Sequence, residues 1–301
     1  MASRQGKAIG LALVAILFWS TMATAFSLAL RQLDFINLLL WSSFISLVGL
    51  AVVLAWQGKW AMALKAIRTE WKHSLLMGLL NPFLYYFILL QAYEMLPAQE
   101  AMALNYTWPV MLALLSIPLL GQRIRPTSLL AILISFAGII LISTHGDPLS
   151  FRFTYPLGDT LALGSSVIWA LFWIYNVRSQ VDPVIKLFLN FIPGFGLSLL
   201  ALIVMGRPLI IPQDAGGWLA VVYIGLFEMG ITFVIWLTAL RLTDSTQRIS
   251  QLVFLSPFLS LLWIRIFLGE HILPATVTGL VLVIAGILLN QWKGRGEKAN
   301  G

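Results

Sequence analysis

The sequence contains no cysteine and very few charged residues, and each shortage excludes a class of protein. Of the 301 residues none is cysteine, and only 10% are Asp, Glu, Lys or Arg. Without thiols the chain can form no disulfide framework, no thiolate metal site and no cysteine nucleophile. Soluble domains carry about 25% charged residues, whereas this chain is 59% hydrophobic with a mean hydropathy of +0.90. The composition predicts an integral membrane protein.

Signatures of catalysis and of metal binding are missing from the sequence as well. There is no G-x-x-x-x-G-K-[ST] loop that would bind and hydrolyse ATP. The three histidines, His73, His145 and His271, fall in connections or at the ends of apolar runs. No pair of acids lies in the middle of a run, as an intramembrane aspartyl protease would require. We therefore expect no enzymatic activity, no bound metal and no cofactor.

The chain consists instead of apolar runs long enough to cross a bilayer. A helix needs about 20 apolar residues to span a hydrocarbon core of about 30 Å. Ten runs qualify: Ala8–Leu30, Ile36–Trp56, Ser74–Ala92, Glu100–Leu119, Thr127–Ser143, Leu157–Val177, Val184–Met205, Gly217–Ala239, Gln247–Phe267 and Ala275–Gln291. The first run is followed by no convincing cleavage site, so it is expected to be retained. The sequence predicts an all-α integral membrane protein of ten transmembrane helices.

The basic residues predict how these helices are oriented. A net charge of +7 suggests nucleic acid in a soluble protein, but here the basic residues lie in short connections, where they set topology. With the N-terminus in the cytoplasm, the inner side receives fifteen Lys and Arg residues and the outer side four. The four outer residues are Arg31, Arg152, Arg207 and Arg265. We expect both termini in the cytoplasm and no nucleic-acid partner.

Glycines and prolines reveal an internal duplication. Pro109, Gly121, Pro126 and Gly138 return 148 positions later as Pro257, Gly269, Pro274 and Gly286. With slips of one or two positions the correspondence extends to Ala92 and Ala239, Gly78 and Gly225, Asp34 and Asp182, Gln32 and Gln180, and Trp19 and Trp169. Glycine and proline constrain the backbone in ways that hydrophobic filler does not. The sequence therefore predicts two homologous units, residues 1–145 and 146–301.

The number of helices in each unit determines how the two units are related. Each unit contains five runs, so the first enters the membrane from the cytoplasm and the second from outside. The units are then related by a pseudo-two-fold axis in the membrane plane. Such inverted repeats are typical of transporters, with the substrate site near the midplane where the halves meet.

The closing pattern of each unit carries a family resemblance. Both units end on a Pro, Gly-Gln or Gly-Glu, Pro and Gly series, with Gln122 in the first and Glu270 in the second. With ten helices in two inverted halves, the chain resembles the drug/metabolite transporter superfamily, its EamA-type exporters most, and among these the aromatic amino acid exporters. The resemblance covers almost the whole chain and implies a central cavity lined by Trp and Tyr. Gln122 departs from the Glu common at that position, which lies at a helix end.

Glu228 is the acid placed deepest within an apolar run. It is the twelfth residue of the run that begins at Gly217, and its counterpart in the first half is Asn81. Ionisable groups inside a membrane are costly, so each is a functional candidate. We interpret Glu228 as the partner of a substrate ammonium group or as the carrier of a coupling proton. The structural alternative is a hydrogen bond to Asn81 or to a neighbouring helix.

Aromatic residues form the second candidate group. Those that lie deeper than an interfacial belt explains are Trp19, Tyr85, Tyr106, Trp108 and Trp169. Asn81, Glu228 and Gln251 would add polar contacts. Each aromatic residue alone could be ordinary packing, but as a set they favour a pocket for flat amphipathic molecules, or for cations through cation–π contacts.

The sequence predicts a secondary transporter of the bacterial inner membrane that exports small amphipathic metabolites by alternating access, aromatic and other amino acids first among them. Its partners are the small-molecule substrate, the lipid bilayer and, as an open question, protons. A monomer is expected, since ten helices can form a complete pathway. Another cargo, such as a nucleobase, sugar nucleotide or lipid-linked group, is one alternative, although none of the nineteen Lys and Arg residues lies mid-helix to bind an anion. An intramembrane transferase is the other, but it would require paired acids or a histidine at membrane depth.

Overall fold

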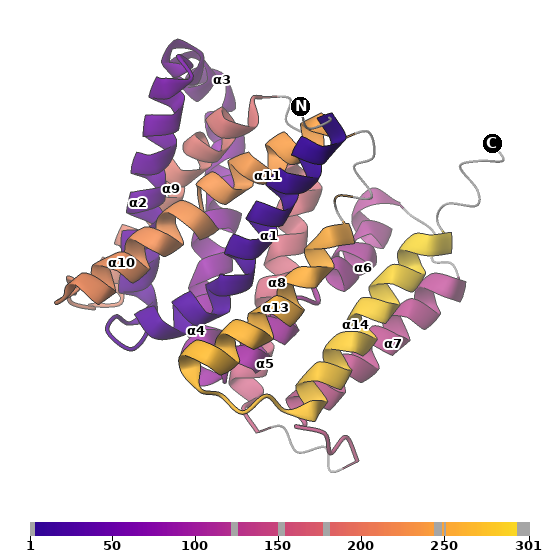
Figure 1. The fold of residues 1–301 in the computed structure, drawn as a ribbon. Coiled ribbons are helices and arrows are strands. Elements are labelled where there is room, and N and C mark those ends of the chain that lie inside the picture. The colour runs from indigo at the N-terminus through magenta and orange to yellow at the C-terminus, as the bar shows by residue number, and fades with distance from the viewer. Residues whose placement is uncertain are drawn as a thin grey trace, which may run out of the picture.

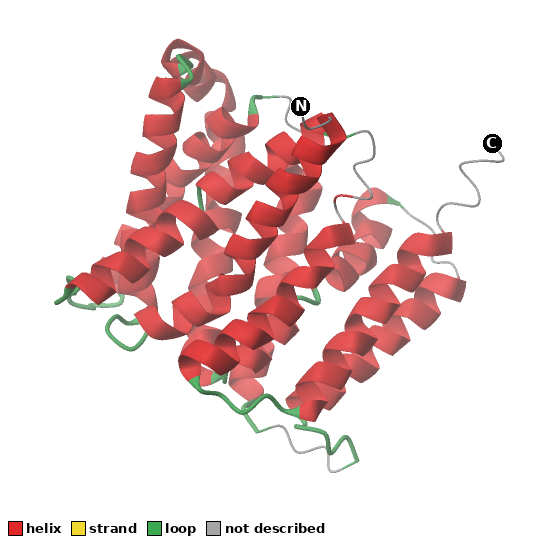
Figure 2. Ribbon diagram, in the orientation of Figure 1, coloured by secondary structure: helices red, strands yellow, loops and turns green. Residues whose placement is uncertain are grey.

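The computed structural model describes residues 4–121, 126–149, 154–176, 181–243, 249 and 251–293, without the side chains of 126–128 and 290–293. In these ranges the regular structure is helical throughout, with no strand (Figure 2). Seven helices are long and apolar enough to cross a membrane, and shorter apolar helices cover Leu129–Ser143, Val253–Leu268 and Pro274–Leu289. Several residues used in the sequence analysis lie outside the described ranges: Gln122, Arg123, Arg125, Arg152, Arg178, Gln180, Gln247, Arg248, Arg295 and Lys298.

The helices follow the apolar runs closely. In chain order they are α1 (Arg4–Ala29), α2 (Phe35–Trp56), α3 (Trp60–Gly78), α4 (Tyr85–Met95), α5 (Ala98–Asn105), α6 (Trp108–Leu120), α7 (Pro126–Ser143), α8 (Pro156–Asn176), α9 (Pro183–Val204), α10 (Ala215–Tyr223), α11 (Ile231–Leu242), α13 (Ser256–Trp263) and α14 (Pro274–Lys293). Short π-helical segments occur at η1 (Leu79–Leu84), η2 (Ile224–Glu228) and η4 (Ile264–Leu268), and a 3₁₀ turn at η3 (Val253–Leu255).

One predicted helix start is wrong. The third run was expected to begin at Ser74, but the helix begins at Trp60, and the continuous segment Trp60–Met95 has 36 residues. At 1.5 Å per residue this segment is about 50 Å long, well beyond the roughly 30 Å of a hydrocarbon core. Its first turns carry Lys65, Arg68 and Lys72 and extend past the apolar part, which is why hydropathy alone did not include them.

Two helices that were expected to be continuous are interrupted at matching places. Between α3 and α4 lies η1, in which Asn81 has an extended backbone with φ −146° and ψ 119°. Between α10 and α11 lies η2, followed by Gly230 at φ −119° and ψ −92°. Asn81 and Glu228 are the counterparts identified from the sequence, so the helices are interrupted at corresponding places, although the backbone geometry of the two interruptions differs.

Helices that are distant in the sequence pack side by side. The pairs are α1 with α11 and α13, α8 with α4 and α6, α2 with α9, and α7 with α14 (Figure 1). The first turn of α1 and the last turn of α14 lie at the same end of the bundle (Figure 1). Glycines permit two of the closest approaches. A Cβ on Gly78 would lie 2.7 Å from Pro193 Cγ in α9, and one on Gly225 would lie 2.7 Å from the carbonyl oxygen of Ser42 in α2.

Aspartates cap the second helix of each half. Asp34 Oδ1 accepts from the backbone N–H of Asn37 at 2.9 Å, and Asp182 Oδ1 from that of Val184 at 3.0 Å. Asp182 also accepts from Lys59 Nζ at 2.8 Å. Burial raises the pKa of Asp182, but the hydrogen bonds from Lys59 and from the Val184 N–H outweigh burial and hold this pKa below its ordinary value. The carboxylate therefore stabilises the start of α9 in its charged form.

Two substitutions at Asp182 distinguish the stability that the helix cap contributes from the stability that the charge contributes. Asp182→Ala is expected to lower the free energy of unfolding by about 1–2 kcal/mol, because an N-cap acceptor is lost. Asp182→Asn keeps a good cap and should lose less, since a partly exposed ion pair contributes about 0–1 kcal/mol. Because the pKa of Asp182 is lowered on folding, the contribution of the charge is present above the ordinary Asp pKa of about 3.9 and is lost below it. Thermal unfolding in detergent should therefore separate wild type from Asp182→Asn at pH 7 and not in acid.

Candidate functional site

A cavity of about 850 Å³ lies at the centre of the bundle, between helices of both halves. This volume is within the range of small-molecule sites. Six of the eight residues proposed from the sequence line it: Trp19, Tyr85, Tyr106, Trp108, Trp169 and Glu228. Asn81 and Gln251 are not among the lining residues. Most of the residues proposed from the sequence therefore lie in the wall of one cavity.

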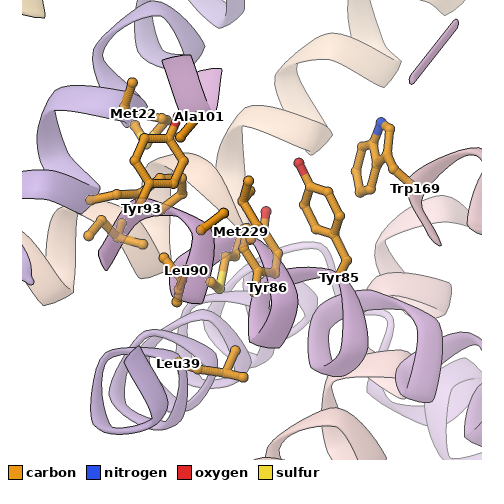
Figure 3. Packing of buried hydrophobic residues seen from close by; sticks show 14 of the residues in the cluster. Met22, Leu39, Tyr85, Tyr86, Leu90, Tyr93, Ala101, Trp169 and Met229 are labelled. Atoms are coloured by element: carbon orange, nitrogen blue, oxygen red, sulfur yellow. The ribbon is translucent and has the colours of Figure 1, made fainter. Parts of the chain in front are cut away.

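Aromatic rings form one continuous part of that wall. Trp169 on α8 lies 4.6 Å from Tyr85 on α4, centroid to centroid, and 5.4 Å from Phe172 on its own helix. Phe233 on α11 contacts Trp169 at 5.9 Å and Trp19 on α1 at 5.5 Å. Figure 3 shows Tyr85 and Trp169 facing each other, with Tyr86 beside them. The rings come from both halves of the chain and offer flat apolar faces to a ligand.

A short chain of hydrogen bonds fixes the polar part of the wall. The Tyr85 hydroxyl donates to Asn105 Oδ1 at 3.2 Å, and Asn105 Nδ2 donates to Ser165 Oγ at 2.9 Å. Ser165 in turn donates to the carbonyl oxygen of Ala162 at 2.6 Å. The chain links α4, α5 and α8 and holds the Asn105 amide in one orientation beside the cavity.

Glu228 stands at the end of the π-helical segment η2 and lines the cavity. Its Oε1 accepts a hydrogen bond from the Tyr86 hydroxyl at 3.1 Å. Its Oε2 is buried and has no hydrogen-bond partner. Burying a carboxylate oxygen without a donor is costly, so this oxygen is suited to a donor that a ligand brings.

The structural alternative considered for Glu228 was a hydrogen bond to Asn81 or to a neighbouring helix. The partner is Tyr86 on the neighbouring helix α4, and not Asn81. Asn81 is only 2% exposed and lies within η1, where its backbone is extended. Gln251 is partly buried and lies two residues before η3.

Several lining residues were missed by the sequence analysis. Asn105 lines the cavity and was not proposed as a site residue. Further lining residues that were not proposed are Tyr93, Ser116, Ser135, Trp173, Phe233 and Trp236. Tyr86 was overlooked because it follows Tyr85 directly, and adjacent residues of a regular helix point in different directions. The π-helical distortion before them has no signal in hydropathy.

The charge of the cavity wall is simple. Among the described lining residues Glu228 is the one ionisable acid, and there is no Lys, Arg or His. The wall therefore carries one carboxyl group, several aromatic faces and a few amide and hydroxyl groups. This combination fits a cation or an ammonium group attached to a flat apolar body.

The cavity reaches one end of the bundle. Its lining includes Leu120, the last residue of α6, and Leu240, near the end of α11. Both helices end on the side where α1 begins (Figure 1). Toward the opposite end Phe26 and Tyr93 pack with their ring centroids 5.3 Å apart.

Beyond Phe26 and Tyr93, contacts between the halves close that end of the bundle. The Glu270 carboxylate accepts from the backbone N–H of Ala98 at 2.8 Å, and Gln99 Oε1 accepts from that of Leu273 at 2.9 Å. These bonds join the start of α5 in the first half to the segment before α14 in the second. The described lining thus extends toward the end of the bundle where α1 begins, and hydrogen bonds between the halves join the helices at the other end.

Comparisons with known proteins agree with this architecture. The EamA-like transporter family matches the chain twice, over residues 6–144 and 156–292. Aromatic amino acid exporter YddG of Ancylobacter novellus is 29% identical over 252 residues, which cover 82% of this chain and 84% of that protein. Uncharacterized transporter YvbV of Bacillus subtilis is 26% identical and covers 77% of this chain and 76% of its own length. A solved crystal structure superposes with a TM-score of 0.68 at 24% identity, with both chains covered in full. The chain belongs to the EamA-like transporter family and is a multi-pass membrane transporter of a small molecule, not an enzyme.

Proposed function

We propose that this transporter exports aromatic and related amphipathic amino acids across the bacterial inner membrane by alternating access. The observation that carries the proposal is the central cavity, in which stacked aromatic rings stand beside the unpartnered Oε2 of Glu228. An aromatic amino acid has a flat ring that can stack on the aromatic wall and an ammonium group that can donate to Glu228 Oε2. The similarity to an aromatic amino acid exporter supports the same substrate class.

We further propose that the chain forms ten transmembrane helices in two inverted five-helix repeats, residues 1–145 and 146–301. The helix pairs support this arrangement: α1 packs on α11 as α8 packs on α4, and α7 pairs with α14. The recurrence of π-helical turns at Asn81 and Glu228 and of aspartate caps at Asp34 and Asp182 supports it as well. With both termini cytoplasmic, the cavity opens toward the cytoplasm, where an exporter loads its substrate. The protein works as a monomer, since one chain lines the whole cavity.

Counterflow of labelled tryptophan into liposomes that contain the purified protein tests the proposed function. Uptake should saturate and should be blocked by unlabelled phenylalanine. Trp108→Ala is expected to raise the KM for tryptophan by up to about tenfold, because one aromatic contact contributes about 0.5–1.5 kcal/mol. Trp71→Ala is the matched control, since Trp71 is 56% exposed and does not line the cavity. Absence of uptake by folded, inserted protein would contradict the amino acid assignment, whereas equal effects of the two variants would remove Trp108 from the binding site.

A further inference from the structure

Two buried acids meet at the end of the bundle opposite the first turn of α1. Glu100 lies in the first turn of α5 and is 2% exposed, and Asp159 lies in the first turn of α8 and is 5% exposed. The two carboxyl groups are close enough to interact electrostatically, and Ser143 at the end of α7 lies near Asp159. The sequence analysis overlooked this pair because both residues fall at helix ends, where acids are usually solvated.

The hydrogen bonding of the pair is incomplete if both acids are ionised. Glu100 Oε2 contacts His145 Nε2 at 2.9 Å. Glu100 Oε1 and both oxygens of Asp159 are buried without a donor. Two carboxylates in contact away from water repel each other, and the usual solution is that they share one proton. One proton between Glu100 and Asp159 converts an unpaired acceptor into a donor and removes one of the two charges.

We infer that Glu100 and Asp159 form a proton-binding site, which His145 connects to the aqueous phase on the outer side of the membrane. His145 is suited to that role because its side chain is 29% exposed while its Nε2 faces the buried pair. Its Nδ1 lies 3.4 Å from the hydroxyl of Thr154, an exposed residue. The imidazole therefore has one nitrogen toward the outer surface and one toward Glu100, and it can relay a proton between them.

The other charged groups near the pair have partners of their own. Of the segments that pack on α5, the one before α14 carries Glu270, whose carboxylate accepts from the Ala98 and Gln99 N–H groups. On α4, Glu94 accepts from the Phe35 N–H at 2.7 Å. On α1 the charged residues Arg4 and Lys7 lie at the opposite end of the bundle.

Two further titratable residues, Asp147 and Tyr155, belong to the segments next to His145. The loop after α7 carries Asp147, and the Tyr155 ring lies 6.4 Å from the His145 ring, centroid to centroid. Around Asp159 the interacting charged groups are Glu100 and His145. The proton occupancy of the pair thus depends mainly on its own two acids and on this histidine.

The same two helices carry the site and part of the cavity wall. Five residues after Glu100, the Asn105 amide donates to Ser165, which lies six residues after Asp159. At 1.5 Å per residue the proton site is about 8 Å along α5 from the cavity. Release of the proton leaves two carboxylates close together and favours separation of the first turns of α5 and α8. Proton binding is therefore coupled to the position of the Asn105 and Ser165 contact, and protons entering the cell can drive export.

Proteoliposomes distinguish this inference from the proposed function on which it rests. With an acidic lumen, protons leaving the vesicle should drive labelled tryptophan inward, above its external concentration. Asp159→Asn and Glu100→Gln should each reduce accumulation to simple equilibration and leave counterflow unchanged, because neither residue lines the cavity. Loss of counterflow in wild type would contradict the amino acid assignment, whereas counterflow without accumulation would overturn the proton site.

An infrared measurement tests the site without any substrate. The purified protein should show the carbonyl stretch of a protonated buried carboxyl group at neutral pH, and part of that band should be absent from both Asp159→Asn and Glu100→Gln. Glu228→Gln is the matched control. Glu228 is another carboxyl group inside the bundle, and any band that it contributes must be distinguished from the band of the Glu100–Asp159 pair. A wild-type spectrum identical to those of the two variants would mean that the pair holds no proton and would overturn the inference.

Discussion

Glu228→Gln is expected to raise the KM for tryptophan in counterflow by at least about 30-fold. The carboxylate is the one ionisable acid among the described cavity residues, and its Oε2 has no protein partner. Removing one member of a buried charge pair typically costs about 2–5 kcal/mol, and each 1.36 kcal/mol corresponds to tenfold. Glutamine has nearly the same shape, so the aromatic wall and the contact with Tyr86 are retained.

Competitors with and without an ammonium group test whether Glu228 contacts that group of the substrate. Tryptamine, which keeps the ammonium group and lacks the carboxylate, should compete with wild type at least as well as tryptophan and should lose its advantage in Glu228→Gln. Indole-3-ethanol has no ammonium group and should compete equally in both proteins. Tyr86→Phe removes one neutral donor to Glu228 and should change the KM by no more than about tenfold. An unchanged KM in Glu228→Gln would exclude an ammonium contact at this residue.

Gly225→Leu is expected to prevent correct packing of the second half against α2. A Cβ at this position would lie 2.7 Å from the Ser42 carbonyl oxygen and 2.7 Å from Ile45 Cβ. A backbone carbonyl cannot move aside as a flexible side chain can, so even alanine should destabilise the fold by about 1–3 kcal/mol. The leucine variant should yield little monodisperse protein in size-exclusion chromatography, and the alanine variant a lowered unfolding temperature.

Gly196 provides a matched control for these variants. It lies within α9, is exposed, and a Cβ there would meet nothing within 4 Å. Gly196→Ala should leave the unfolding temperature unchanged or raise it, because alanine favours a helix over glycine by up to about 1 kcal/mol. Equal destabilisation at both positions would indicate that the close approach of η2 to α2 does not limit packing.

The sequence predicted those features that depend on composition and on residue types with distinctive local roles, such as glycine and aspartate. Hydropathy indicated the seven described helices that are long and apolar enough to cross a membrane. Residue type and depth within the runs selected eight residues, six of which line one cavity. The aspartates that were matched between the halves, Asp34 and Asp182, both cap helices. The matched glycines Gly121 and Gly269 both end helices in the left-handed conformation, at φ 65° and 70°. The matches were predicted and the caps and helix ends were not, but each depends on a local physical requirement that the residue type itself expresses.

Features that depend on side-chain contacts between helices could not be predicted. Hydropathy does not distinguish an α turn from a π turn, so the extended backbone of Asn81 and the contact between Tyr86 and Glu228 were missed. The interaction of Glu100 with Asp159 joins residues 59 positions apart, and nothing in either run marks them as neighbours. The amphipathic start of α3 was missed because its charged residues lowered the hydropathy of a segment that is nevertheless helical.

The π-helical segment η2 affects which side chains of the following helix, α11, face the cavity. A π turn holds one more residue than an α turn, so the helix after it is rotated by about 100° relative to an uninterrupted α-helix. Deleting one residue from Ile224–Glu228 would remove the extra residue of this turn. The helix α11 that follows would then be rotated, and Phe233 and Trp236 would turn away from the cavity. A one-residue deletion in this segment would therefore change which side chains line the transport pathway.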